Sequence, residues 1–210
     1  MNDHRSATRQ LRKELRARRR RLSRNERQQA ARDLARILRR LREFGAARSV
    51  AFYISRGGEI DPAMALQEAL RAGKRCYLPV LSPARQNRLY FSEVTHTSRF
   101  RDNCYGIPEP QQPRRRWCSA AQLDLILLPL VAFDAAGNRI GMGGGYYDAT
   151  LAFRRCRSRY RRPYLIGLAH DFQRVDSIQS QPWDVPLDGV MTDGEIYRPS
   201  NEKHKITAET

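Results

Sequence analysis

The sequence predicts an α/β protein with an open, mostly parallel sheet covered by helices on both faces, a Rossmann-like three-layer arrangement. From residue 49 onward, segments with strand character alternate with segments with helical character. The longest apolar run, residues 123–131, is apolar on both faces, as a central strand of a parallel sheet must be. No internal repeat and no second core-forming segment is found. We therefore expect one domain over residues 1–198, followed by a disordered tail over 199–210.

Two helices are expected before the sheet, over residues 8–21 and 24–44 of the basic N-terminal segment. Ser23 and Glu26 have the spacing of a capping box at the start of the second helix. Apolar residues then recur at helical spacing, and Gly45 is expected to end that helix.

The elements of the sheet follow in order along the chain. Asp61 is a natural N-cap and Pro62 a natural first residue of a helix that Gly73 closes. Residues 95–116 are polar and contain prolines, so we expect a loop there, and a further helix should run to about residue 156. Predicted strands cover residues 49–54, 75–81, 88–94, 123–131 and 163–169, with short strands near 189–192 and 195–197.

Positive charge is concentrated at the N-terminus. The net charge is +17, and residues 1–48 hold 17 basic and 5 acidic residues, so +12 of it lies there. Such a block can bind nucleic acid, an anionic membrane surface or a polyanionic small molecule, or it can be a solvated helix face. No aromatic residues interleave with residues 16–24 (RARRRRLSR), which disfavours nucleic acid. We expect most of these arginines, including Arg19, Arg20 and Arg21, to face water.

Other features limit the cellular setting. No apolar run reaches 18 residues, so no membrane span is expected. The basic N-terminus is not followed by an apolar segment, so it is not a secretory signal. The spacing of the four cysteines fits neither a zinc site nor a dense disulfide framework. We expect a cytoplasmic protein with reduced thiols and, because no apolar helix stripe calls for a partner, a monomer.

Residues 137–145 (GNRIGMGGG) hold five glycines between a predicted strand and a predicted helix. Backbone N–H groups in such a turn converge on one point, and a phosphate is their natural guest. The alternative is a tight connection that merely needs positive φ. The spacing is neither a Walker A element, since no Lys-Ser/Thr pair follows, nor a dinucleotide fingerprint, since Tyr146 replaces the third glycine.

Charged residues flank the glycines. The Arg139 guanidinium can form bidentate hydrogen bonds with phosphate oxygens. Asp148 follows the tyrosine pair, where a carboxylate beside phosphates can hold Mg²⁺ or can simply complement the helix dipole. Asp184 and Asp188 form a second acidic cluster that could close the site.

Residues 129–151 (PLVAFDAAGNRIGMGGGYYDATL) closely resemble the signature of the 5-formyltetrahydrofolate cyclo-ligase family, also called methenyltetrahydrofolate synthetases. Four other segments fall in the order of that family: LRKELRARRRRLS, VAFYISRGGEID, YGIPEP and WDVPLD. The resemblance covers nearly all of residues 9–195. It implies ATP-dependent ring closure of 5-formyltetrahydrofolate to 5,10-methenyltetrahydrofolate, with Mg²⁺ as the metal and ADP and phosphate as the other products. The folate could be polyglutamylated.

The resemblance also implies roles for single residues around ATP and the metal. Arg139 and Tyr147 would be catalytic, and Asp148 and Asp184 would hold Mg²⁺, with Asp188 as the alternative to Asp184. Arg12 matches the arginine of the N-terminal ATP-binding element. The loop residues that would cradle the ATP phosphates are Arg139, Ile140, Gly141, Met142, Gly143, Gly144, Gly145, Tyr146 and Tyr147.

Other positions would contact the folate. Glu59 would hydrogen-bond the pterin, Ile54 would pack against its ring, and Tyr105 would lie near it. Met142 to Tyr146 would border the folate as well as ATP. The sequence departs from the family at Thr8, where a Lys or Arg is usual, and Arg9 is the candidate substitute.

The residues are also compatible with two other functions. One is a nucleic-acid-binding protein that uses the arginine block, whose affinity would fall steeply with salt. The other is a different α/β enzyme acting on a phosphorylated ligand, such as a sugar-phosphate isomerase, which would turn over without ATP.

Overall fold

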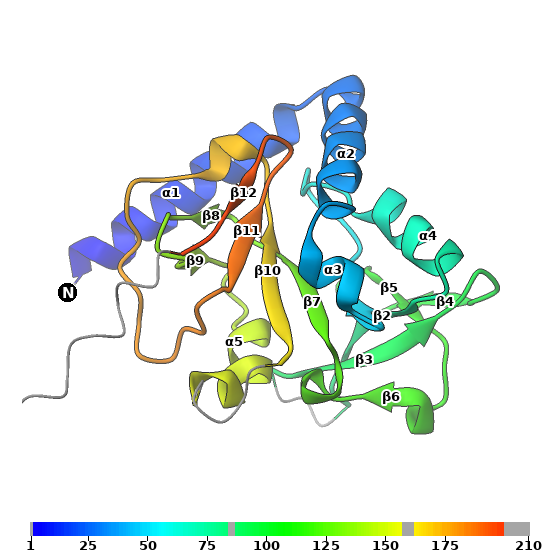
Figure 1. Cartoon of the computed structure of the whole chain (residues 1–210). Helices are drawn as coiled ribbons and strands as arrows, with labels where there is room; N and C mark the ends of the chain where they lie inside the picture. The colour runs from blue at the N-terminus through cyan, green and yellow to red at the C-terminus, as the bar shows by residue number, and fades with distance from the viewer. Residues whose placement is uncertain (1, 84–86, 157–161, 200–210) are drawn as a thin grey trace, which may run out of the picture.

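The computed structural model describes residues 2–83, 87–156 and 162–199. Within these ranges, eight strands form one sheet in the order β12-β11-β10-β7-β1-β2-β3-β6 (Figure 1). The strands β2, β1, β7, β10 and β11 are parallel, while β3, β6 and β12 add antiparallel pairs toward the edges. Their bounds are β1 Ser49–Ala51, β2 Arg75–Leu81, β3 Leu89–Val94, β6 Trp117–Cys118, β7 Leu125–Pro129, β10 Tyr164–Leu168, β11 Gly189–Met191 and β12 Ile196–Tyr197. The predicted α/β class is confirmed.

The central strand β7 shows why both faces of the sheet must be covered. Leu125 and Leu127 belong to one buried cluster, whereas Ile126 and Leu128 belong to the cluster on the opposite face. Helices α2 (Arg24–Leu38), α3 (Arg42–Ala46) and α4 (Ala63–Arg71) cover the first face. Leu151 of α5 (Tyr146–Leu151) packs on the second face, so the sheet forms the middle of three layers.

The predicted N-terminal helix pair is present, with two corrections. Helix α1 spans Asn2–Arg21 and so begins before residue 8. The capping box is formed, since Ser23 Oγ accepts a hydrogen bond from the N–H of Glu26 and the Glu26 carboxylate accepts one from the N–H of Ser23. The single helix expected over 24–44 is wrong, because α2 ends at Leu38 and Gly45 lies inside α3. Leu41, which is 2% exposed, takes an extended conformation there, and the break turns its side chain into the core.

The start of α4 is shifted by one residue from the prediction. Pro62 is the N-cap rather than the first helical residue, and the Asp61 carboxylate accepts from the N–H of Ala63 at 3.1 Å. Gly73 ends the helix with a φ of +74°, as predicted. None of the helices in the described ranges is long and apolar enough to cross a membrane. Of the predicted tail, residues 200–210 lie outside the described part of the chain.

The expected loop over 95–116 contains a hairpin, made of β4 (Phe100–Asp102) and β5 (Pro108–Pro110), and a 3-10 turn at Arg114–Arg116. The Asn103 side chain closes the hairpin by accepting from the N–H groups of Tyr105 and Ile107 at 2.9 and 3.1 Å. The prediction failed because this turn depends on a side-chain amide rather than on apolar alternation.

The strand predicted over residues 123–131 is shorter in the structure, where β7 covers Leu125–Pro129. After β7 the chain forms β8 (Ala132–Phe133), which pairs with β9 (Arg139–Ile140) in a separate two-stranded sheet. The glycine loop therefore follows this hairpin rather than the central strand. Helix α1 packs Leu15 against the hairpin and so lies beside the glycine loop.

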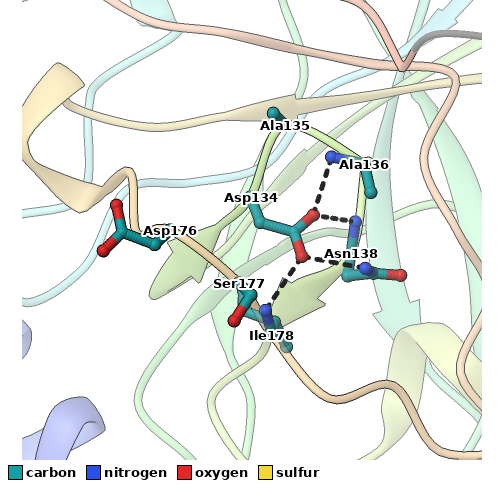
Figure 2. A pocket seen from close by; sticks show the side chains of 7 residues that line it. All are labelled: Asp134, Ala135, Ala136, Asn138, Asp176, Ser177 and Ile178. Carbon is teal, nitrogen blue, oxygen red and sulfur yellow. Dashed lines mark hydrogen bonds between the residues drawn. The ribbon is translucent and has the colours of Figure 1, made fainter.

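Asp134 anchors the hairpin (Figure 2). Its buried carboxylate accepts from the N–H groups of Ala136, Asn138 and Ile178 and from the Asn138 side-chain amide, all within 3.0 Å. It lines a cavity of about 340 Å³. Because its oxygens already accept four hydrogen bonds, we assign Asp134 to holding the hairpin that presents Arg139.

Candidate functional site

The site lies where β1 and β7 are neighbours and the chain leaves them for opposite sides of the sheet. Ligands of open α/β sheets bind at such a switch point, beyond the carboxyl ends of the strands. Here the turn that follows β1 meets segments that follow β7 and β10. His170, after β10, places Nε2 3.1 Å from the carbonyl oxygen of Gly58, and Arg19 Nη1 donates to the carbonyl oxygen of Leu130, after β7, at 3.1 Å.

The glycine loop uses its conformational freedom at two positions. Gly143 has a φ of +102° and Gly145, the N-cap of α5, a φ of +66°. These values are rarely adopted by residues with a side chain. The loop is exposed, and Arg12 Nε of α1 donates to the carbonyl oxygen of Gly141 at 2.9 Å. The predicted ATP-binding arginine and the predicted phosphate loop are thus in direct contact.

Arg139 joins two acidic segments that are distant in sequence. Its side chain is 5% exposed, and its guanidinium pairs with Asp148 Oδ1 at 2.5 Å. It also donates to the carbonyl oxygen of Val185, whose N–H in turn lies 3.3 Å from Asp148 Oδ1. Asp184 directly precedes Val185, so both predicted metal ligands flank one backbone segment. The adjoining cavity has a volume of about 240 Å³ and is lined by Asn138, Arg139, Ser180, Gln181, Asp184, Val185 and Pro186.

This donor set fits Mg²⁺, which favours one or two carboxylates supplemented by phosphate oxygens and water. No group of three or more His, Cys, Asp or Glu residues that could hold a metal occurs in the described residues. A cation at Asp148 and Asp184 would therefore take its remaining ligands from water and a bound phosphate. Asp188 is differently engaged, because its carboxylate pairs with Arg154 at 2.8 Å and accepts from the N–H of Leu165. The Asp184 carboxylate accepts from the N–H of Gln181 at 2.8 Å, but in the described residues no arginine pairs with it as Arg154 pairs with Asp188.

Glu59 is presented by a turn whose conformation favours glycine. Gly57 and Gly58 have φ values of +58° and +80°, and the Glu59 carboxylate accepts from the N–H of Arg56 at 3.0 Å. Its side chain is 8% exposed and lies 3.9 Å from Arg19 Nη1. Burial raises the pKa of Glu59, although the Arg56 N–H and the charge of Arg19 oppose the shift.

Tyr147 belongs to the same environment as Glu59. Burial, and then the negative charge of Glu59, raise the pKa of the Tyr147 hydroxyl above its ordinary value. At neutral pH this hydroxyl is protonated and can donate a hydrogen bond.

Tyr105 and Tyr146 form a tyrosine pair that links the β4–β5 loop to the start of α5. The hydroxyl groups of Tyr105 and Tyr146 are 2.9 Å apart, and their rings meet edge to face with centroids 6.3 Å apart. The hydrogen bond with Tyr105 raises the pKa of Tyr146 to about 12. Thr150 fixes α5 by accepting from the N–H of Leu89 on β3. The predicted folate-facing tyrosine of the β4–β5 loop thus touches the first residue of α5, directly after the glycine loop.

Two predicted residues are not drawn into this cluster. Ile54 is half-buried and packs against the core under α2–α4. Arg9 is exposed, and within the part of the chain that the structure describes no hydrogen bond or ion pair ties it to the loop.

The expectation that Arg19 faces water is wrong, since it is 1% exposed. Leu11, Leu15 and Arg19 are spaced four residues apart, and the first two pack on the β8–β9 hairpin. Arg19 thus occupies the next position of the buried stripe of α1. That spacing was the available signal, and the arginine-rich composition obscured it.

Comparisons with known proteins identify the family of the chain. The sequence model of the 5-formyltetrahydrofolate cyclo-ligase family matches residues 4–193. The 5-formyltetrahydrofolate cyclo-ligase of Escherichia coli K12 is 35% identical over 183 residues, which cover 87% of this chain and 98% of the relative. The mouse protein of the same name is 29% identical over 192 residues, covering 89% and 93%.

A solved structure shares the fold. The NMR structure of Aquifex aeolicus 5,10-methenyltetrahydrofolate synthetase superposes with a TM-score of 0.77 at 28% identity, covering 97% of this chain and 96% of the other. The resemblance identified in the sequence is confirmed by the family match and by these relatives. The chain is a ligase that belongs to the 5-formyltetrahydrofolate cyclo-ligase family.

Proposed function

We propose that this chain catalyses the ATP- and Mg²⁺-dependent closure of 5-formyltetrahydrofolate to 5,10-methenyltetrahydrofolate, releasing ADP and phosphate. The observation that carries the proposal is the contact between Arg12 and Gly141, which brings a cationic helix to the glycine loop. A loop of exposed N–H groups flanked by arginines from two elements suits a polyphosphate.

The residues around the glycine loop have different roles in binding ATP. Arg12 and Arg139 neutralise phosphate charge, and the loop N–H groups orient the phosphates. Asp148 and Asp184 would hold Mg²⁺, which supplies charge neutralisation and alignment of the phosphate oxygens. Because Arg139 also pairs with Asp148, it keeps that carboxylate in place.

The folate side is formed by Glu59, Tyr147 and the Tyr105–Tyr146 pair. A buried carboxylate matches the N–H donors of a pterin, and the protonated Tyr147 can donate to the formyl or phosphate oxygen. The two other tyrosines offer ring surface for a flat ligand.

The reaction needs no protein nucleophile. The formyl oxygen attacks the γ-phosphorus of ATP, and ADP leaves as the P–O bond to it breaks. N10 of the folate then attacks the activated carbon, the C–O bond to phosphate breaks, and the N10 proton passes to water. Such chemistry depends on positioning and charge neutralisation, which are what the clustered arginines, glycines and carboxylates provide.

The test is an assay of ADP release with and without 5-formyltetrahydrofolate, coupled to absorbance of the methenyl product. We expect equimolar ADP and methenyl product, and loss of both when ATP or Mg²⁺ is omitted. Product formation without ATP, or a protein that binds nucleic acid and shows neither product, would overturn the proposal.

Replacing Arg12 with Met is expected to raise the KM for ATP about tenfold, because one charge-assisted phosphate contact is lost. The folate KM should change less. Burial, and then the nearby Arg16, lower the pKa of Arg12, but the group stays charged at neutral pH. Steady-state kinetics with each substrate varied in turn provides the measurement.

Lys13→Met is the matched control, since it removes an adjacent but exposed charge from α1. It should leave the ATP KM unchanged. Equal effects of the two substitutions would mean that the general charge of α1, rather than a contact of Arg12, attracts ATP.

A further inference from the structure

Helix α1 sends one arginine into the interior of the protein. Arg19 is 1% exposed, and its guanidinium touches three separate segments. Nη1 donates to the carbonyl oxygen of Leu130 at 3.1 Å and lies 3.9 Å from Glu59 Oε1, while Nη2 lies 3.8 Å from the sulfur of Met142. Leu130 lies on the segment after β7, Glu59 on the segment after β1, and Met142 in the glycine loop. Arg19 therefore lies at the switch point of the sheet.

The backbone of α1 is equally close to this turn. A Cβ atom built on Gly58 would lie 2.4 Å from the carbonyl oxygen of Arg19, a separation that real Cβ atoms do not show. The turn that presents Glu59 therefore rests directly on the helix that carries Arg19. His170 holds the same turn from the other side through the carbonyl oxygen of Gly58.

We propose that Arg19 is a positioning residue that fixes the Glu59 carboxylate and the glycine loop relative to each other. It thereby couples the pterin side of the site to the phosphate side. The inference rests on the proposed function, because that function assigns Glu59 and the loop to the two substrates.

The free-energy cost of burying Arg19 indicates that this residue serves to position its neighbours rather than to stabilise the fold. Moving a guanidinium out of water is costly, and its Nε has no hydrogen-bond partner in the described structure. A carboxylate 3.9 Å away offsets only part of that cost. Replacing both partners of a buried ion pair by apolar residues is often neutral, whereas removing one partner leaves the other charge unpaired and lowers stability. Because the Glu59 carboxyl group can be protonated when its partner is lost, Arg19→Met should be less stable but still fold, while the spacing of Glu59 and Met142 is no longer set.

Removing Arg19 also changes the charge around Glu59. From α1, Arg16 and Arg19 lower the pKa of Glu59, and the N–H of Arg56 does the same within the turn. Tyr53, on the same segment after β1, and Tyr147 of α5 also interact electrostatically with the carboxylate. Without Arg19 the pKa of Glu59 rises further, so Glu59 is protonated at higher pH, and folate affinity should begin to fall at higher pH as the solution is acidified.

The experiment compares Arg19→Met and Arg19→Lys with Arg21→Met, which removes an exposed charge from the same turn of α1. Calorimetric binding of 5-formyltetrahydrofolate is measured across the acidic to neutral range, together with the ATP KM and thermal unfolding. We expect Arg19→Met to raise the folate Kd about tenfold at neutral pH and to raise the ATP KM. The fall in folate affinity on acidification, called the acid limb below, should shift to higher pH. Arg19→Lys should restore the acid limb but not the Kd, since one ammonium cannot reach both Leu130 and Met142. Arg21→Met should match wild type.

A folded Arg19→Met protein with wild-type Kd and acid limb would overturn the inference. If that variant does not fold, Arg19→Lys decides, because a stable Lys variant with wild-type Kd and ATP KM would overturn it as well. A wild-type chain that cannot close the folate ring would instead overturn the proposed function, so the two failures are distinguishable.

Discussion

Asp148→Asn is expected to lower turnover about a thousandfold while leaving the fold intact. The substitution keeps an oxygen that can accept from Arg139 and from the N–H of Val185, but it removes the charge that would hold Mg²⁺. A metal that neutralises phosphate charge contributes several kcal/mol to the transition state, and each 1.4 kcal/mol is a factor of ten in rate. Single-turnover ring closure at several Mg²⁺ concentrations gives the measurement.

The dependence on Mg²⁺ separates a metal ligand from a residue that merely orients Arg139. If Asp148 binds the metal, the Asn variant should need much more Mg²⁺, and Asp184→Asn should act in the same direction but less severely. Asp176→Asn, on the segment next to the β8–β9 hairpin, is a matched change at a carboxylate outside this cluster and should have no effect. Unchanged Mg²⁺ dependence in the Asp148 variant would contradict the assignment.

The sequence predicted those parts of the fold in which local pattern and tertiary environment agree. Strand β7 is apolar at every position because both faces of the sheet are covered there, and this lack of polar alternation indicated a central strand. The β4–β5 and β8–β9 hairpins were missed because side chains hold them. Asn103 closes one and Asp134 anchors the other, and neither interaction has an apolar period.

The site shows a similar division. Arg139, the glycines and Asp148 are close in sequence, so a single motif indicated them. Asp184 was indicated only as one of two neighbouring acidic residues, and the role of Glu59 required the family resemblance, since only the folded chain brings these residues near the loop. Composition does not distinguish Arg19 from the other arginines of α1, whereas its four-residue spacing from Leu11 and Leu15 places it on the buried stripe of that helix.

Glu59→Gln is expected to weaken binding of 5-formyltetrahydrofolate ten- to a hundredfold at neutral pH and to leave ATP binding unchanged. A charge-assisted hydrogen bond to the pterin is worth about 1.5–3 kcal/mol, and the amide cannot replace it. Because burial raises the pKa of Glu59, the wild-type carboxylate becomes protonated at a higher pH than an ordinary Glu side chain. Wild-type affinity should therefore decline on acidification and approach that of the Gln variant, whose affinity should show little dependence on this group.

Stability should change in the opposite sense to affinity. A carboxyl group whose pKa is higher in the folded than in the unfolded state binds more protons when folded, so its contribution to stability is present at low pH and is lost as pH rises through the folded pKa. Glu59→Gln removes the group whose ionisation lowers stability as pH rises, so the midpoint temperature of unfolding at neutral pH should stay equal or rise. Glu14→Gln, at an exposed position of α1, should change neither quantity. A Gln variant that unfolds more readily and loses both ligands equally would assign Glu59 to folding, whereas higher stability with weaker folate binding is the result expected of a carboxylate kept buried for its ligand.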